Sequence, residues 1–181
     1  MRAERCKASR ARQLKRAPTE MISRRANCKE GDWIALPLVR RGGWALGLIA
    51  RYRAPSCLGY FFGPRHENPP TMDDTQGLTA ADAILIGHTG NLGLRKGEWH
   101  VIGHHPFWSR ANWPMPKSWM LQDGQHYLMT YDDDDPGRMI DRRPVSVGEI
   151  AGAIPSIVNG HVALAIKLDM AIAGNEDRTA A

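Results

Sequence analysis

Three neighbouring histidines are the first residues of this 181-residue chain whose types and spacing could do chemistry. His100 and His104 lie four positions apart, the spacing that places two metal ligands on one face of a helix, and His105 follows directly. Gly103 and Pro106 disfavour a helix at this point, however, and the motif HExxH is absent. We therefore predict no metal site, and a metal-dependent hydrolase that uses these histidines is kept as an alternative.

A run of four aspartates, Asp132–Asp135, is the most distinctive charged feature of the sequence. One interpretation is a solvated turn, because a Pro-Gly pair follows directly. Adjacent like charges repel one another, so an ordered run needs cations close by. Those cations could come from this chain, where Arg138, Arg142 and Arg143 are nearest in sequence, or from a basic partner. Calcium is a further alternative, although the spacing of an EF-hand is missing.

Motifs for nucleophilic catalysis and phosphate binding are absent. The sequence has no GxSxG elbow, and the glycines of residues 90–97 match neither GK[ST] nor GxGxxG, so they predict turns between short strands. Cys6, Cys28 and Cys57 form no CxxC pair, and Cys57 is expected to be a small buried residue rather than a thiolate. We therefore expect a protein without catalytic residues or a cofactor.

The scaffold for these residues is organised around residues 31–52. An apolar run, residues 33–36, is followed by a second run in which apolar side chains alternate over residues 44–50, which places them on one face of a strand. Between the runs, Gly42 and Gly43 supply the positive φ values that a tight turn needs. The pattern predicts a β-hairpin.

The rest of the chain reads mainly as further short strands. They are expected at residues 56–63, 83–87, 99–102 and 125–131. Residues 64–80 are rich in proline and polar side chains and form either a solvated connection or a partner-facing loop. Residues 104–119 carry three tryptophans and three prolines and are expected to be irregular. Residues 162–168 close the domain as a strand or as the start of a terminal helix.

The basic charge of the chain is confined to its beginning. Residues 1–30 hold ten Lys and Arg against three Asp and Glu, whereas residues 31–181 hold 14 against 16. We expect residues 1–29 to be a disordered basic arm, residues 30–172 one globular domain, and residues 173–181 a frayed tail.

The arm allows three interpretations. It is a nucleic-acid-binding tail, an inert extension, or an artefact of a start site that properly lies at Met21. No aromatic residue interleaves its basic side chains, which argues against stacking on single strands. No apolar run is long enough to span a membrane or to serve as a secretion signal, so we expect a cytoplasmic protein without a membrane partner.

Taken in order, several motifs carry a family resemblance. GDWIALPL, GGWALGLIAR, LGYFFGP, GLRKGEWHVIG, NWPMP and YDDDDP closely resemble the immunity protein 26 family of bacterial polymorphic toxin systems. The resemblance covers about residues 31–145, with Asn112 at a position where an acidic residue is expected. It implies a small, cytoplasmic, non-catalytic protein that binds and neutralises the toxin domain of a delivered effector. The implied fold is mostly antiparallel β, with an SH3-like barrel core, additions and minor helix, so the class lies between all-β and α+β.

The resemblance also indicates which chemistry would recognise a partner. A toxin that is a nuclease is commonly basic, so an acidic loop would accelerate association and aromatic side chains would anchor it. The predicted partner-binding residues are Glu98, Trp108, Trp113, Trp119, Asp132, Asp133, Asp134 and Asp135. For the tryptophans, packing in the core is the alternative.

Overall fold

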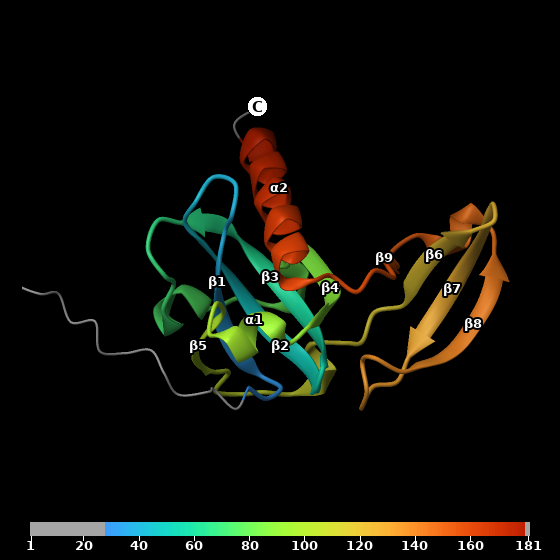
Figure 1. The fold of residues 1–181 in the computed structure, drawn as a ribbon, viewed down its shortest axis with the longest axis horizontal. Helices are drawn as coiled ribbons and strands as arrows, with labels where there is room; N and C mark the ends of the chain where they lie inside the picture. Colours follow the sequence, from blue (N-terminus) through green and yellow to red (C-terminus); the bar gives the residue numbers. More distant parts are fainter. Residues whose placement is uncertain (1–27, 180–181) are drawn as a thin grey trace, which may run out of the picture.

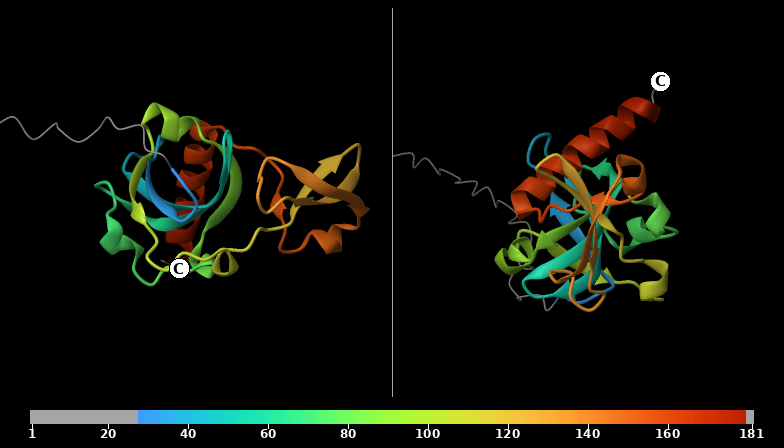
Figure 2. Two further views of the ribbon diagram at one scale, coloured as in Figure 1. Left: turned by 90° about the horizontal axis from the view of Figure 1, so that it is seen from below. Right: turned by 90° about the vertical axis from the view of Figure 1, so that its right-hand side faces the viewer.

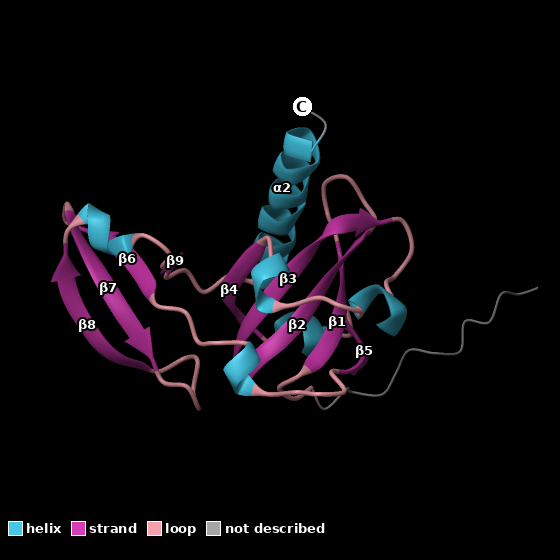
Figure 3. Ribbon diagram, turned by 180° about the vertical axis from the view of Figure 1, so that it is seen from behind, coloured by secondary structure: helices cyan, strands magenta, loops and turns pink. Residues whose placement is uncertain are grey.

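The structure, a computed structural model, describes residues 28–179. It contains two β-sheets and one long C-terminal helix (Figures 1 and 3). The β-rich fold expected from the sequence is therefore confirmed. Most of the expected basic arm, including Met21, lies outside the described residues. At its end, Cys28 is buried and the amide of Lys29 donates to Asp32 at 2.8 Å.

The first sheet is antiparallel throughout and has the strand order β4-β3-β2-β1-β5. Its strands are β1 (Asp32–Pro37), β2 (Trp44–Arg53), β3 (Ser56–His66), β4 (Leu85–Gly90) and β5 (His100–His104). The predicted hairpin is β1–β2, with φ values of 69° at Gly42 and 81° at Gly43. Because β5 returns to pair with β1, and bulges interrupt the register, the sheet curls as Figure 2 shows.

Both faces of the first sheet are buried, so its strands read as continuous apolar runs rather than as one alternating face. Ile34, Leu36, Ile49 and Phe61 belong to the cluster that packs against α2 (His161–Thr179). A second cluster, built around Trp33, lies under the connecting segments. Its other buried members are Leu46, Leu48, Ala50, Leu58, Tyr60, Phe62 and Trp113.

α2 settles the choice that the sequence left open for residues 162–168, which are helical. Leu164, Leu168 and Ile172 repeat at helical spacing and are completely buried against the first sheet. The helix continues to Thr179, through most of the residues expected to form the tail. No helix in the described part of the chain is both long and apolar enough to cross a membrane.

The buried carboxylate of Asp169 fastens α2 to the β1–β2 turn, and the exposed Glu176 adds an ion pair with Arg41 at 3.1 Å. Asp169 accepts hydrogen bonds from the backbone amides of Arg40 and Arg41, both at 3.0 Å, and from Nε of Arg41 at 2.9 Å. Burial by itself raises the pKa of Asp169, but the hydrogen bonds from Arg41 and Arg40 outweigh burial, and the pKa lies below its usual value.

Replacing Asp169 with asparagine is expected to lower the free energy of unfolding by about 2 kcal/mol at pH 7, since hydrogen bonds to charged groups are the stronger ones. A carboxyl group whose pKa falls on folding stabilises the folded state above its unfolded pKa of about 3.9, and this stability is lost as the pH falls through the folded pKa. The difference between wild type and variant should therefore shrink below about pH 4. Urea unfolding from pH 7 to pH 3 measures it, with Asp177→Asn, exposed on the same helix, as the control. A difference that does not change with pH would contradict the role of the ionised carboxylate.

The second sheet projects from the first and has the order β8-β7-β6-β9 (Figure 1). Its strands are β6 (Ser118–Gln122), β7 (Gln125–Tyr131), β8 (Met139–Val145) and β9 (Ile154–Pro155). Only β7 was predicted. The short helices are η1 (Met72–Thr75), η2 (Ala80–Asp82), α1 (Leu92–Lys96), η3 (Arg110–Asn112) and η4 (Val147–Ile150).

Candidate partner-binding site

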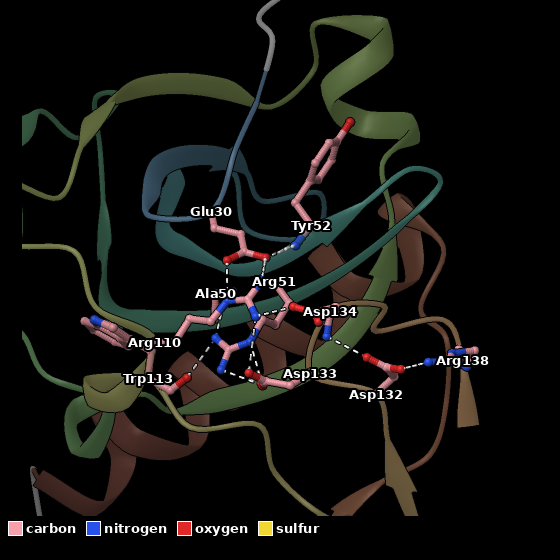
Figure 4. Close-up of polar contacts among 10 residues, drawn as sticks. All are labelled: Glu30, Ala50, Arg51, Tyr52, Arg110, Trp113, Asp132, Asp133, Asp134 and Arg138. Atoms are coloured by element: carbon pink, nitrogen blue, oxygen red, sulfur yellow. Dashed lines mark hydrogen bonds and ion pairs between the residues drawn. The ribbon is translucent and has the colours of Figure 1, made fainter. Parts of the chain in front are cut away.

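Arg51 lies at the centre of the candidate site and is a charged side chain on β2 that is only 2% exposed. Its Nε donates to Oδ1 of Asp133 at 2.8 Å, and its Nη2 lies 2.7 Å from the same oxygen (Figure 4). Its Nη1 donates to the backbone carbonyls of Ala50 at 2.7 Å and Trp113 at 3.1 Å. A buried charge is costly unless it is paired, so Asp133 is the partner that this guanidinium requires.

Arg110 joins the same acidic residues to the start of β1. Its Nε and Nη2 donate to the two carboxylate oxygens of Glu30, at 2.8 and 2.9 Å. Its Nη1 lies 2.6 Å from Asp134 and 3.4 Å from Asp133. The hydrogen bond from Arg110 lowers the pKa of Asp134, so that carboxyl group stays ionised. A two-pronged contact of this kind fixes geometry as well as charge.

The outer aspartates of the run are also paired within the chain. Asp135 lies 3.4 Å from Nε of Arg53, and Asp132 pairs with Arg138 while accepting the amide of Asp134 at 2.7 Å. We call Asp132–Asp135 together with Arg51, Arg53, Arg110 and Arg138 the aspartate clasp. All four carboxylates have an arginine partner, which is the internal-pairing alternative that the sequence left open.

Two of the three arginines expected to balance the run lie elsewhere. Arg142 stacks over the ring of Tyr127, 3.9 Å from its centroid, and Arg143 pairs with Glu149 at 3.1 Å. Only Arg138 belongs to the clasp. Arg51 and Arg110, which do the central pairing, precede the run by 82 and about 24 positions, so proximity in sequence was a poor guide to them.

The clasp fixes the second sheet to the first, and a buried histidine completes the junction. His88 on β4 donates from Nδ1 to the carbonyl of Pro136 at 3.0 Å, and its ring lies 4.4 Å from that of Tyr131. Burial lowers the pKa of His88, so the neutral ring is favoured. The loop that carries the aspartates is therefore seated on β2, β3 and β4 rather than free in solvent.

The predicted tryptophans occupy three different environments. Trp113 is 1% exposed and meets Trp33, Tyr60 and Phe62 edge to face, at ring-centroid distances of 6.0, 5.3 and 6.1 Å. The surface anchor predicted at Trp113 is thus a core residue. Trp119 on β6 is half-buried, with its ring 5.9 Å from that of His126.

Trp108 is also half-buried, and it closes over Gly31, where a Cβ would lie 2.7 Å from its Cγ. Gly31 has a φ of 83°, so both its conformation and the contact with Trp108 require glycine. Trp108 is therefore a packing residue on most of its surface. Of the predicted tryptophans, the structure links only Trp113 to the clasp, through its carbonyl.

Glu98 lies apart from the clasp. Its carboxylate is 3.6 Å from Nζ of Lys96 and 3.0 Å from Nε2 of His161, at the start of α2. The predicted residues therefore do not form one surface. Asp133 meets Trp113 through Arg51, whereas Glu98 and Trp119 contact other residues.

The histidines singled out by their spacing are not neighbours in function. Nδ1 of His104 lies 2.9 Å from Asp32, and the ring of His100 lies 5.2 Å from that of Trp44. Within residues 28–179, no group of three or more His, Cys, Asp or Glu side chains is placed to hold a metal ion. Burial raises the pKa of the Cys57 thiol to about 12, in agreement with the buried role expected for it.

Phe107 is an exposed aromatic residue that the sequence did not single out. It is 82% exposed, the highest fraction among the large apolar side chains of the described residues. Phe107 lies in the turn that follows β5, whereas the next residue, Trp108, packs over Gly31. The sequence alone does not show which of the two neighbouring aromatic rings, Phe107 or Trp108, packs inward.

Comparison with known families gives one match. The family model described as Immunity protein 26 matches residues 29–126, more than half of the chain. The matched region takes in the whole first sheet and ends at the start of β7, so the aspartate run lies beyond it. No curated protein and no solved structure matches the chain.

Proposed function

This chain belongs to the immunity protein 26 family, and from that premise we propose that it protects a bacterial cell by binding and neutralising the toxin domain of a cognate polymorphic toxin. It acts in the cytoplasm as a stoichiometric inhibitor and catalyses no reaction. The single observation that carries this proposal is the family match over residues 29–126.

The described structure supports a binding role. The first sheet is buried on both faces and is held at α2 by Asp169 and at the second sheet by the clasp, so it is a rigid scaffold. The segments that follow β3 and β5, residues 67–84 and 105–117, lie over the second cluster and reach the surface. Binding residues are commonly presented on segments positioned in this way by a rigid scaffold.

The test is co-expression with the toxin domain of the cognate polymorphic toxin. We expect growth to be restored, and a catalytically inactive form of the toxin domain to co-purify with the full chain as a defined complex. A toxin domain from an unrelated system, expressed at the same level, is the control and should be neither neutralised nor bound. Absence of both rescue and complex with the cognate domain would overturn the proposed function.

A further inference from the structure

The acidic surface available to a partner differs from the one that the aspartate run suggested. Each aspartate of the clasp has an arginine partner, whereas four other carboxylates lie on one segment, between β3 and β4. These are Glu67, Asp73, Asp74 and Asp82. In the described part of the chain none of them pairs with a lysine or arginine, and the one charge pair among them joins Asp74 to His66, at 3.8 Å.

The roles of these four carboxylates divide into two kinds. Asp74 and Asp82 complete capping boxes with Thr71 and Thr79, so they also hold η1 and η2 in place. Glu67 and Asp73 are exposed and take no part in a cap. Their charge can therefore be removed without removing a cap.

The acidic segment packs against β5, the strand that leads to Phe107. Met72, the first residue of η1, packs on Gly103 so closely that a Cβ there would clash. Trp108 packs over Gly31, next to the residue that pairs with His104. η1 and β5 accordingly lie side by side at this edge of the first sheet (Figure 1).

The segment that carries Phe107 is held firmly on its inner side. The amide of His105 donates to the carbonyl of Gly31 at 2.8 Å, and the amide of Phe107 donates to Nδ1 of His105 at 3.2 Å. The ring of His105 lies against those of Trp33 and Trp113, with centroids 6.0 Å away in each case. An exposed aromatic side chain on a backbone fixed in this way loses little conformational entropy on binding.

We propose that Phe107, together with the carboxylates Glu67 and Asp73 of the segment that packs on β5, forms the surface that receives the toxin domain. The partner surface is basic and carries an apolar pocket, which Phe107 fills. This inference rests on the proposed function and adds to it the location of the interface and the chemistry of the partner. Aromatic anchors supply most of the affinity at such interfaces, and complementary charge mainly raises the association rate.

The experiment measures binding of the full chain and its variants to the catalytically inactive cognate toxin domain by surface plasmon resonance. Phe107→Ala is expected to raise Kd about 30-fold, the size of a hot-spot loss, chiefly through faster dissociation. Val158→Ala is the matched control, because Val158 is an apolar residue that is 69% exposed and lies in the segment between β9 and α2. Circular dichroism and urea unfolding establish that both variants are folded.

The charge of the surface is tested separately. The double variant Glu67→Gln/Asp73→Asn is expected to lower the association rate constant about fivefold at low salt and to reduce its salt dependence. Asp123→Asn, which removes an exposed carboxylate from the β6–β7 turn, is the control and should leave the rate unchanged.

The outcomes separate the surface from the function. If wild type binds the toxin domain and Phe107→Ala binds within twofold of it, the surface is wrong and the proposed function stands. If wild type does not bind, the proposed function fails first. If sedimentation instead shows that the chain self-associates and that Phe107→Ala makes it monomeric, Phe107 belongs to a homo-oligomer interface and the toxin-binding surface is overturned.

Discussion

Replacing Trp113 with alanine is expected to lower the free energy of unfolding by about 3–5 kcal/mol, the usual cost of removing a large aromatic side chain from a core. Trp113 is completely buried and contacts three aromatic rings of the second cluster, so its removal leaves a cavity that these rings cannot close without moving. The carbonyl that accepts from Arg51 remains in the variant, because it belongs to the backbone. Urea unfolding followed by circular dichroism measures the effect.

Trp119→Ala is the matched control for this experiment. Trp119 is half-buried on β6, outside the cores of the first sheet, and its replacement should cost clearly less stability. If Trp113→Ala kept wild-type stability but lost affinity for the toxin domain, Trp113 would be a partner anchor, as the sequence predicted, and its assignment to the core would be wrong.

Replacing Asp133 with alanine is expected to cost about 2–4 kcal/mol of unfolding free energy, because it leaves the buried guanidinium of Arg51 without a counter-charge. The upper range for a wholly buried pair does not apply, since Asp133 itself is 52% exposed and water reaches its side of the contact. High salt should reduce this loss of stability only slightly, because the Arg51 side of the ion pair is shielded from dissolved ions. Urea unfolding at low and high salt measures both.

Two variants separate loss of the ion pair from loss of the loop. Asp134→Asn removes a highly exposed partner of Arg110, which keeps Glu30, and should have a much smaller effect. Adding Arg51→Met to Asp133→Ala removes the unpaired charge and should restore part of the stability, which a double-mutant cycle quantifies. Wild-type stability in Asp133→Ala would show that the clasp does not hold the two sheets together.

This second prediction also changes how the aspartate run can be tested as a steering element. Neutralising Asp132–Asp135 together would remove the partners of four arginines, so a slower association with the toxin domain would report a disturbed junction as well as lost charge. The carboxylates at Glu67 and Asp73 are free of this complication.

The local features of the fold were readable from the sequence. The β1–β2 hairpin follows from its alternating apolar residues and from Gly42-Gly43, and β7 follows from a short β-rich run. β8 was not readable, because its residues 139–144 are exposed and include Asp141, Arg142, Arg143 and Pro144. Charge and proline are typical of a protected sheet edge but give no strand signal.

The long-range features were beyond local patterns. The pairing of Arg51 with Asp133 joins residues 82 positions apart, and nothing near either residue predicts it. The burial of Trp113 and the exposure of Phe107 depend on how residues 104–117 lie across the sheet, which composition alone does not determine. The family resemblance was confirmed for residues 29–126, whereas the YDDDDP motif lies past the matched region.

The first sheet depends on α2, the last helix of the chain, to cover one of its apolar faces. The family match stops at residue 126, but Leu164, Leu168 and Ile172 of α2 cover the apolar face that includes Ile34 and Phe61. A nascent chain that has emerged only as far as β7 would therefore expose the apolar face of the first sheet, which α2 covers in the complete fold. The segment that the family model matches is shorter than the segment that must be synthesised before the apolar face of the first sheet is covered.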